Sequence, residues 1–218
     1  PAGSGGDVVA RQLTKHFVEN LPGKPRMKVV NRPGGRGTVA LNFLYDKGKP
    51  DGTTLYHGQW SAPAVIANDP GVRYVPEKMG HIGSNGAYIA LVVRGDKTTS
   101  LEGLMTAQDL IIGGRGAANA IETLGNLSLR TMGIPFRYVG GFKGFSKVQA
   151  AIKANEVHGG HAGIPGFNKF FGKNSDIAWP VYYYPLYDEN GKAKPIPEGV
   201  LPAGTPSLID AYQKIHGK

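Results

Sequence analysis

The sequence contains no cysteine, which excludes disulfides, thiolate metal sites and cysteine nucleophiles. It also has no apolar run near the ~18 residues that a membrane-spanning helix needs. The patterns GxSxG, HExxH and GxxxxGK[ST] are absent, so nothing supports a serine-hydrolase elbow, a helical zinc site or a nucleotide P-loop. From these absences we expect a protein that is not an enzyme and that holds neither a cofactor nor a metal.

Positive charge is the most pronounced feature of the composition. The 218 residues include 25 Lys and Arg against 16 Asp and Glu, which gives a formal net charge of +9. Such a surplus attracts nucleic acid, anionic surfaces or small anions. The basic residues are scattered, and no window is densely basic. We therefore expect a general bias toward small anions and no nucleic-acid partner, with a basic nucleic-acid-binding module as a lesser alternative.

The first eleven residues, PAGSGGDVVAR, combine a glycine-rich loop with the start of a helix. Asp7 stands where a helix N-cap is expected, and apolar residues follow at helical spacing at Val9, Leu13 and Phe17. Such a loop leaves several backbone N–H groups directed at one point, where the helix dipole also favours negative charge. The stretch therefore predicts an anion site, although a plain turn has the same pattern.

Alternating strands and helices are predicted along the rest of the first hundred residues, which favours a parallel sheet flanked by helices. Strands are expected at 27–30, 54–57 and 88–93, and a helix begins at Thr38. We interpret 63–76 as a surface loop.

The second half repeats the opening arrangement. Gly113–Asn119 is glycine-rich and lies between a predicted strand at 110–112 and a predicted helix at 121–132. Further strands are expected at 136–139, 157–163 and 177–184, and further helices at 101–107, 146–154 and 207–215. Two such loops, one in each half, predict a ligand cleft between two lobes.

Three ordered motifs resemble a known family. PAGSGGDVVAR at 1–11, VVNRPGGRGTVA at 29–40 and KPDGTTLYHGQ at 49–59 are similar to motifs of the solute-binding receptors of tripartite tricarboxylate transporters, the Bug or TctC-like family. The order and the spacing also agree. The likeness weakens after residue 100 and continues to about residue 210.

The resemblance implies a two-lobed α/β fold like that of periplasmic binding proteins, in which each lobe is a mainly parallel sheet flanked by helices. We expect lobe 1 to comprise 1–94 plus 184–218, and lobe 2 to comprise 95–183. Compared with the family, a first strand before Pro1 and a segment after Lys218 are expected to be missing. The resemblance further implies a periplasmic location after removal of a signal peptide, a small organic acid as ligand, and membrane transporter subunits as partners. We expect a monomer.

The backbone N–H groups of each of the two loops would bind one end of a carboxylate or dicarboxylate ligand. Arg115 is the leading side-chain candidate, because a guanidinium forms forked pairs with carboxylates; the alternative is an exposed arginine beside a turn. Gln59, Trp60 and Ser61 follow a predicted strand, where parallel sheets present ligand groups. The predicted ligand-binding residues are Ala2, Gly3, Ser4, Gly5, Gly6, Gln59, Trp60, Ser61, Gly114, Arg115, Gly116, Ala117, Ala118, Asn119, Tyr138 and Ala162.

Other polar residues are interpreted as structural. Asp7 would repel an acid and is expected to cap its helix. Ala162 stands where many members of the resembled family carry an acidic residue that recognises amino groups, which disfavours an amino-acid ligand. His158 and His161 are three apart on a predicted strand and would point to opposite faces, so we expect no zinc site. Glu122 and Glu156 have no evident partner in the sequence. An enzyme that binds a phosphate or carboxylate substrate with the same loops remains an alternative, as does a relative that binds nothing.

Overall fold

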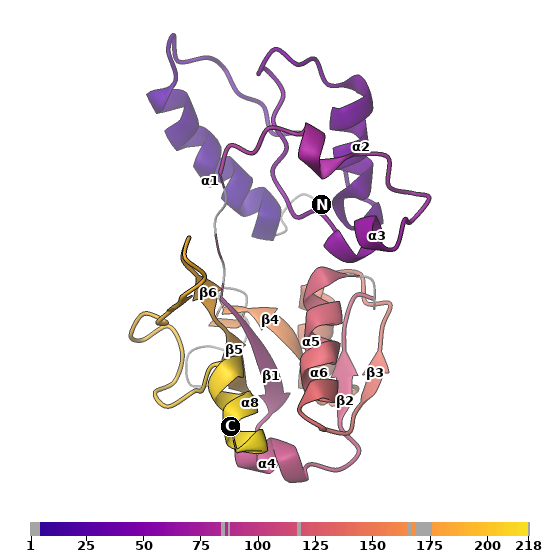
Figure 1. Cartoon of the computed structure of the whole chain (residues 1–218), viewed down its shortest axis with the longest axis vertical. Coiled ribbons are helices and arrows are strands. Elements are labelled where there is room, and N and C mark those ends of the chain that lie inside the picture. Colours follow the sequence, from indigo (N-terminus) through magenta and orange to yellow (C-terminus); the bar gives the residue numbers. More distant parts are fainter. Residues whose placement is uncertain are drawn as a thin grey trace. The chain divides into compact units, whose positions relative to one another are not determined.

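The computed structural model describes residues 5–83, 86, 88–116, 119–164, 167–168 and 176–217. The chain divides into two compact units, Pro1–Ile82 and Gly83–Lys218 (Figure 1). None of the helices within the described ranges is long and apolar enough to cross a membrane.

The first unit consists of helices and connecting segments. Its elements are α1 (Gly5–Asn20), the 3₁₀ turn η1 (Gly35–Gly37), α2 (Thr38–Lys47), α3 (Ala62–Ile66) and the 3₁₀ turn η2 (Pro76–Lys78). The helix α1 begins before Asp7, so the prediction that Asp7 is the N-cap is wrong. The buried Asp7 carboxylate instead accepts hydrogen bonds from Arg11 Nε (3.1 Å) and from Asn31 Nδ2 (2.7 Å). Asp7 thereby ties α1 to the glycine-rich segment Asn31–Gly37.

The strands predicted in the first unit do not form. Residues 27–30 and 54–57 are largely exposed, and the described residues 5–82 contain no β-strand. A strand is stable only when its backbone N–H and C=O groups pair with a neighbouring strand, and these segments have no such neighbour within the described ranges. The expected parallel sheet in the first lobe is therefore wrong for these residues. The predicted loop 63–76 is also wrong in part, because α3 occupies its first residues.

A five-stranded sheet organises the second unit. Its strands are β1 (Ile89–Arg94), β2 (Ile111–Gly113), β3 (Arg137–Val139), β4 (Gly159–Gly163) and β5 (Ala178–Tyr184), in the order β3-β2-β4-β1-β5. The strand β2 is parallel to β3 and β4, whereas β1 is antiparallel to both β4 and β5. Four strands therefore run in one direction, and β1 alone runs in the other. A hairpin of β6 (Leu186–Tyr187) and β7 (Ala193–Lys194) follows the sheet.

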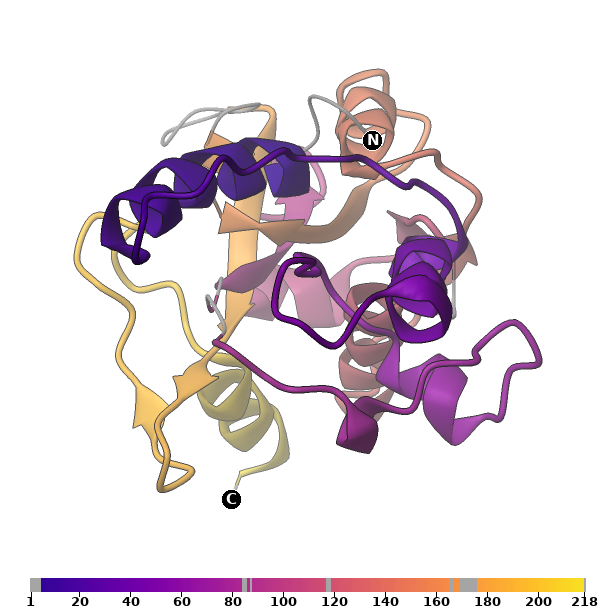
Figure 2. The ribbon, with the colours of Figure 1, turned by 90° about the horizontal axis from the view of Figure 1, so that it is seen from above.

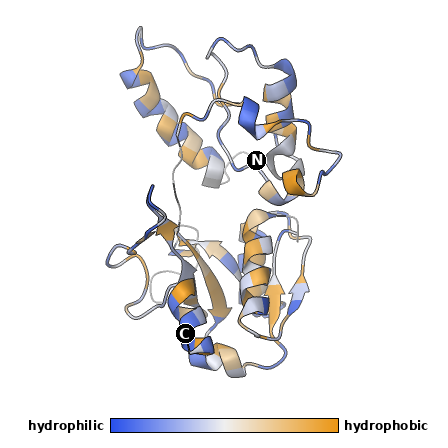
Figure 3. Cartoon of the chain, viewed as in Figure 1, coloured by the Kyte–Doolittle hydropathy of each residue, from blue (hydrophilic) through white to orange (hydrophobic). Residues whose placement is uncertain are grey.

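Helices cover both faces of this sheet. They are α4 (Leu101–Thr106), α5 (Ala120–Thr131), α6 (Phe145–Lys153) and α8 (Leu208–His216). Leu91 and Val93 of β1 belong to a buried cluster with residues of α4, α5 and α8, whereas Ala90 and Val92 belong to a second cluster with residues of α6. Successive side chains of β1 point to opposite faces of the sheet, so this strand contributes to both buried clusters. Accordingly, β1 is hydrophobic from Ile89 to Val93 (Figure 3). The helix α8 lies beside β5 in two perpendicular views (Figures 1 and 2).

The predicted α/β class is confirmed, and every predicted strand and helix of the second unit is present with small shifts at its ends. Residues 184–217 group with the second unit, because β5 pairs with β1 along the sheet and α8 packs on β5. The division into 1–94 plus 184–218 and 95–183, and the cleft between two lobes, stay predictions.

Candidate functional site

Two glycine-rich loops of the second unit, one that begins at Gly114 and one that begins at Gly140, meet at one edge of its sheet. They follow β2 and β3, which are parallel neighbours and therefore end at the same edge. Gly114 N–H donates to the Val139 carbonyl (2.9 Å), and Phe142 N–H donates to the Gly114 carbonyl (3.3 Å). The carboxyl edge of parallel strands is where α/β proteins place ligand groups. This edge contains five of the predicted site residues, namely Gly114, Arg115, Gly116, Asn119 and Tyr138.

Asn119 shapes the transition from the loop into α5. It is the N-cap residue, and its Oδ1 accepts a hydrogen bond from Ile121 N–H (3.1 Å). The same Oδ1 accepts a second hydrogen bond from Arg115 Nη2 (2.9 Å). Asn119 is buried, so both bonds are shielded from water. A single amide oxygen therefore fixes the helix start and the arginine together.

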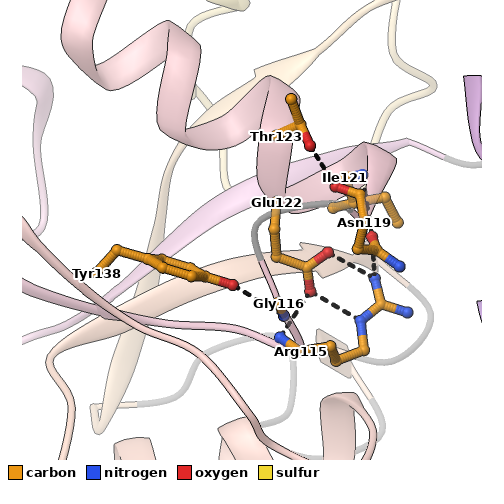
Figure 4. Close-up of polar contacts among 7 residues, drawn as sticks. All are labelled: Arg115, Gly116, Asn119, Ile121, Glu122, Thr123 and Tyr138. Atoms are coloured by element: carbon orange, nitrogen blue, oxygen red, sulfur yellow. Dashed lines mark hydrogen bonds and ion pairs between the residues drawn. The ribbon is translucent and has the colours of Figure 1, made fainter. Parts of the chain in front are cut away.

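The central contact of the loop joins Arg115 to Glu122 (Figure 4). Arg115 Nε lies 2.7 Å from Glu122 Oε1, and Nη2 lies 3.1 Å from Oε2, which is the forked geometry that guanidinium and carboxylate prefer. The Arg115 backbone N–H also donates to Oε1 (3.2 Å). Glu122 is 2% exposed, whereas the Arg115 side chain is 27% exposed. The buried carboxylate is thus satisfied by three donors of one residue.

Tyr138 of β3 closes the other side of the loop. Its hydroxyl oxygen accepts a hydrogen bond from Gly116 N–H (3.0 Å). Burial, together with the nearby Glu122 charge, raises the pKa of Tyr138, so the phenol keeps its proton at neutral pH. Gly114 packs so closely that a Cβ there would meet the Tyr138 hydroxyl and would lie 2.7 Å from Glu122 Cγ. Only glycine fits at this point, so a larger residue would disrupt the loop itself.

These contacts change the expected role of the backbone. The N–H groups of Gly114, Arg115 and Gly116 were predicted to bind a ligand, but each donates to an oxygen of the chain itself. Within the described ranges, Arg115 Nη1 and Asn119 Nδ2 have no such partner. The donors that the described loop presents are therefore on side chains.

The other predicted residues lie elsewhere. Gly5 and Gly6 lie in the first turn of α1. Ser61 is buried and caps α3 by accepting from Ala64 N–H (3.3 Å), Trp60 is 49% exposed, and the Gln59 carbonyl accepts from the Tyr56 hydroxyl (2.8 Å). Ala162 is fully buried in the cluster beside α6, so it presents nothing to a ligand in this unit. Outside the described residues lie Ala2, Gly3, Ser4, Ala117 and Ala118.

Glu122 is the residue that sequence reasoning missed. Its signal was its position: it is the third residue of α5, where a carboxylate commonly reaches back to the N-terminal end of the helix. Here it reaches past the cap residue to Arg115, seven positions upstream.

The histidines have separate structural roles. His158 Nδ1 accepts a hydrogen bond from Ile111 N–H (3.1 Å). His161 lies in β4, is fully enclosed, and its Nε2 has no partner within the described ranges. Burial lowers the pKa of His161 to about 3. No group of three His, Asp or Glu gathers around one point in the described part of the chain.

The first unit also has an open hollow of about 560 Å³. It is lined by Arg11 of α1 and by Arg26, Met27, Lys28 and Val29. None of the predicted ligand-binding residues lines it. Its three cations add to the positive bias of the chain.

Two of the solved structures with a similar arrangement are described as binding proteins, and a third as a periplasmic transporter. The chain matches a crystal structure of a TctC solute-binding protein from Polaromonas, without ligand, at a TM-score of 0.57 and 16% identity, covering 100% of this chain and 80% of that one. It matches the periplasmic binding protein BugD at 0.57 and 17% identity, covering 99% and 78%. It matches a structure described as a periplasmic transporter at 0.64 and 20% identity, covering 100% and 78%.

The chain has the TctC/Bug fold. No protein-family model matches the sequence, and no curated protein matches it either. The TctC/Bug fold is therefore assigned from three-dimensional structure, and it confirms at the level of the fold the resemblance predicted from three sequence motifs.

Proposed function

We propose that this protein captures a small organic anion, a carboxylate or dicarboxylate, and delivers it to membrane transporter subunits. The observation that carries the proposal is Arg115, which Glu122 and Asn119 hold in a fixed position at the carboxyl edge of β2 and β3. An arginine that is already ordered loses little conformational freedom when it binds an acid. A charge-assisted bond to a carboxylate contributes about 1.5–3 kcal/mol.

The setting of Arg115 favours reversible binding. The formal net charge of +9 attracts anions in general. The raised pKa of Tyr138 keeps the phenol neutral, so the phenol adds no negative charge that would repel an acid. Hydrogen-bond donors that do not change their protonation state bind an anion and release it without chemistry.

An enzyme is the rival proposal. A general acid or base needs a carboxyl or imidazole group that can reach a substrate and exchange a proton. Glu122 is buried and fully engaged by Arg115, and His161 is enclosed with its pKa lowered to about 3. Neither group suits that task. Turnover of a panel of phosphoesters and acyl compounds would favour the enzyme, whereas stabilisation by acids without turnover favours a binding protein.

The structural neighbours support the location and the partners that we propose. They are a TctC solute-binding protein, a periplasmic binding protein and a protein described as a periplasmic transporter. By analogy, this chain would act in the periplasm as a monomer and close two lobes around its ligand.

The proposal is tested with a thermal-shift screen of aliphatic and aromatic acids, followed by calorimetry. Arg115→Ala should weaken the binding of an acid that the screen identifies by about tenfold to a hundredfold, because one charge-assisted pair is lost. Arg137→Ala is the matched control: Arg137 is an exposed arginine at the opposite end of β3, and its removal should leave the affinity unchanged. A loss below about threefold in Arg115→Ala, or no acid that binds, would contradict the proposal.

A further inference from the structure

We propose that the Glu122 carboxylate accepts hydrogen bonds from the inward-facing donors of Arg115 and thereby orients this side chain. As a result, the site selects singly charged carboxylate groups over phosphate or sulfate. This inference rests on the proposed function. It assigns Glu122 as a positioning residue and Asn119 as a second ligand donor beside Arg115.

The inner side of the loop is already occupied. Arg115 N, Nε and Nη2 all donate to the two oxygens of Glu122, at 3.2, 2.7 and 3.1 Å. Glu122 is 2% exposed, so a ligand acid would have to displace a buried carboxylate and leave it without a partner. An external anion therefore binds on another side of the guanidinium.

The same contacts determine which donors of the loop face away from Glu122. Asn119 Oδ1 is used twice, by Ile121 N–H and by Arg115 Nη2, so the Nδ2 group of that amide points the other way. In Figure 4, Asn119 Nδ2 and the guanidinium nitrogen without a dashed line lie on the same side, away from Glu122. Two donors on neighbouring side chains thus present a site for the two oxygens of one carboxylate. The Arg115 side chain is 27% exposed, so part of it remains in contact with water.

The charge of the loop sets its selectivity. Arg115 contributes +1 and Glu122 contributes −1, so the pair has no net charge with which to balance two negative charges on a single anionic group. A carboxylate can satisfy both outer donors with a single charge. Phosphate and sulfate bring a second negative charge close to the buried carboxylate of Glu122, where the low dielectric strengthens the repulsion. We therefore expect carboxylates to be preferred to these ions.

Glu122→Gln tests the inference, because glutamine keeps the shape of the side chain and removes its charge. Binding of butyrate and of inorganic phosphate is measured at pH 7.5 by NMR titration, with the Arg115 Nε–H resonance as a reporter of the forked pair. We expect butyrate to bind about fivefold more weakly, because Arg115 is less well held, and phosphate to bind several-fold more tightly, because the site gains a net positive charge. The Nε–H resonance should move upfield as the carboxylate partner is lost.

Asp96→Asn is the matched control. It removes the carboxylate that pairs with Arg94 at the end of β1, and β1 is antiparallel to β4, so this pair lies at the opposite edge of the sheet. The ratio of butyrate to phosphate affinity should stay at its wild-type value in this variant. Asn119→Ser provides a second test, because serine still caps a helix but lacks the Nδ2 donor. It should weaken butyrate binding without strengthening phosphate binding.

The outcomes separate the two proposals. If wild-type protein binds no acid of the panel, the proposed function fails and the inference fails with it. If wild-type protein binds butyrate and Glu122→Gln leaves the butyrate-to-phosphate ratio unchanged, the inference alone is overturned. If Glu122→Gln does not fold, Asn119→Ser decides, and unchanged butyrate affinity in that variant overturns the inference.

Discussion

Short apolar segments form strands in the second unit of the chain but not in the first. In the second unit, short apolar segments pair into a sheet, and Ala90, Leu91, Val92 and Val93 are completely buried. In the first unit, comparable segments at 27–30 and 54–57 stay unpaired within the described ranges, and Val30 is 60% exposed. Apolar composition alone therefore does not make a strand. A neighbouring strand on which the backbone can close its hydrogen bonds is also needed.

Amide hydrogen exchange should show the largest difference between the units. The amides of Ala90–Val93 lie in the centre of the sheet and open only when the second unit unfolds. The amides of 27–30 have no partner in the described structure. We expect exchange in β1 to be slower by about a thousandfold or more, as measured by exchange mass spectrometry with peptide resolution. Equal rates in the two segments would contradict the comparison.

Glycine-to-alanine substitutions should show the second-largest difference between the units, in the free energy of unfolding. In Gly125→Ala, the added methyl group would collide with the buried His161 ring, which sits on a strand and cannot move aside. We expect a loss of about 3 kcal/mol in the free energy of unfolding, at the upper end of the usual cost of overpacking.

Gly80→Ala, in the first unit, is the matched control. A methyl group there meets nothing within 4 Å, so the change should stay within about 0.5 kcal/mol. Urea unfolding of Gly125→Ala can be followed by the fluorescence of Trp179 in β5, in a Trp60→Phe background, and that of Gly80→Ala by the fluorescence of Trp60, in a Trp179→Phe background, so that each unit reports its own unfolding. A loss in Gly125→Ala no larger than that in Gly80→Ala would show that α5 and β4 can separate at little cost.

The smallest of the three expected effects is the pH dependence of stability that the buried His161 causes. His161 has its pKa lowered to about 3, whereas an unfolded histidine titrates near its ordinary value of about 6.5. Between these values only the unfolded chain binds the proton, so the free energy of unfolding decreases as the pH falls through this window and is fully retained above it. Lowering the pH from 7 to 5 should cost about 2 kcal/mol in the second unit.

His161→Leu should remove most of this pH dependence, whereas replacing the exposed His57 of the first unit by Gln should not change it. Urea unfolding at the two pH values, monitored through Trp179, measures both variants. An unchanged pH dependence in His161→Leu would assign the effect to other groups.

The sequence was most informative where local signals and tertiary structure agree. The helix predicted at 101–107 is present and is capped by Ser100, which accepts from Gly103 N–H (3.1 Å), and the apolar run predicted at 88–93 is β1. The failures have two different physical causes. Whether 27–30 becomes a strand depends on a partner that no local pattern encodes, and Asp7 lies within α1 because α1 begins earlier than its apolar spacing indicated.

The candidate site was predicted in part. The glycine-rich pattern identified Gly114–Asn119, and its single cation, Arg115, was correctly placed beside a helix start. The pattern did not predict that Glu122 would accept the hydrogen bonds of Arg115, because that contact depends on how the loop after β2 brings Arg115 to the first turn of α5. Spacing alone does not distinguish a carboxylate directed at solvent from one directed at an arginine.

The reversed strand β1 dictates the order in which the second unit can assemble. The parallel strands β2, β3 and β4 follow one another along the chain with one helix between each pair, so they can associate as soon as they are made. The strand β1 precedes them all, yet its two neighbours begin only at Gly159 and Ala178. At a synthesis rate of roughly 5–20 residues per second, its apolar segment waits for several seconds before it can be enclosed. Pairing of this early strand with its two late neighbours is therefore a late step of folding, and β5 can join the sheet only through β1.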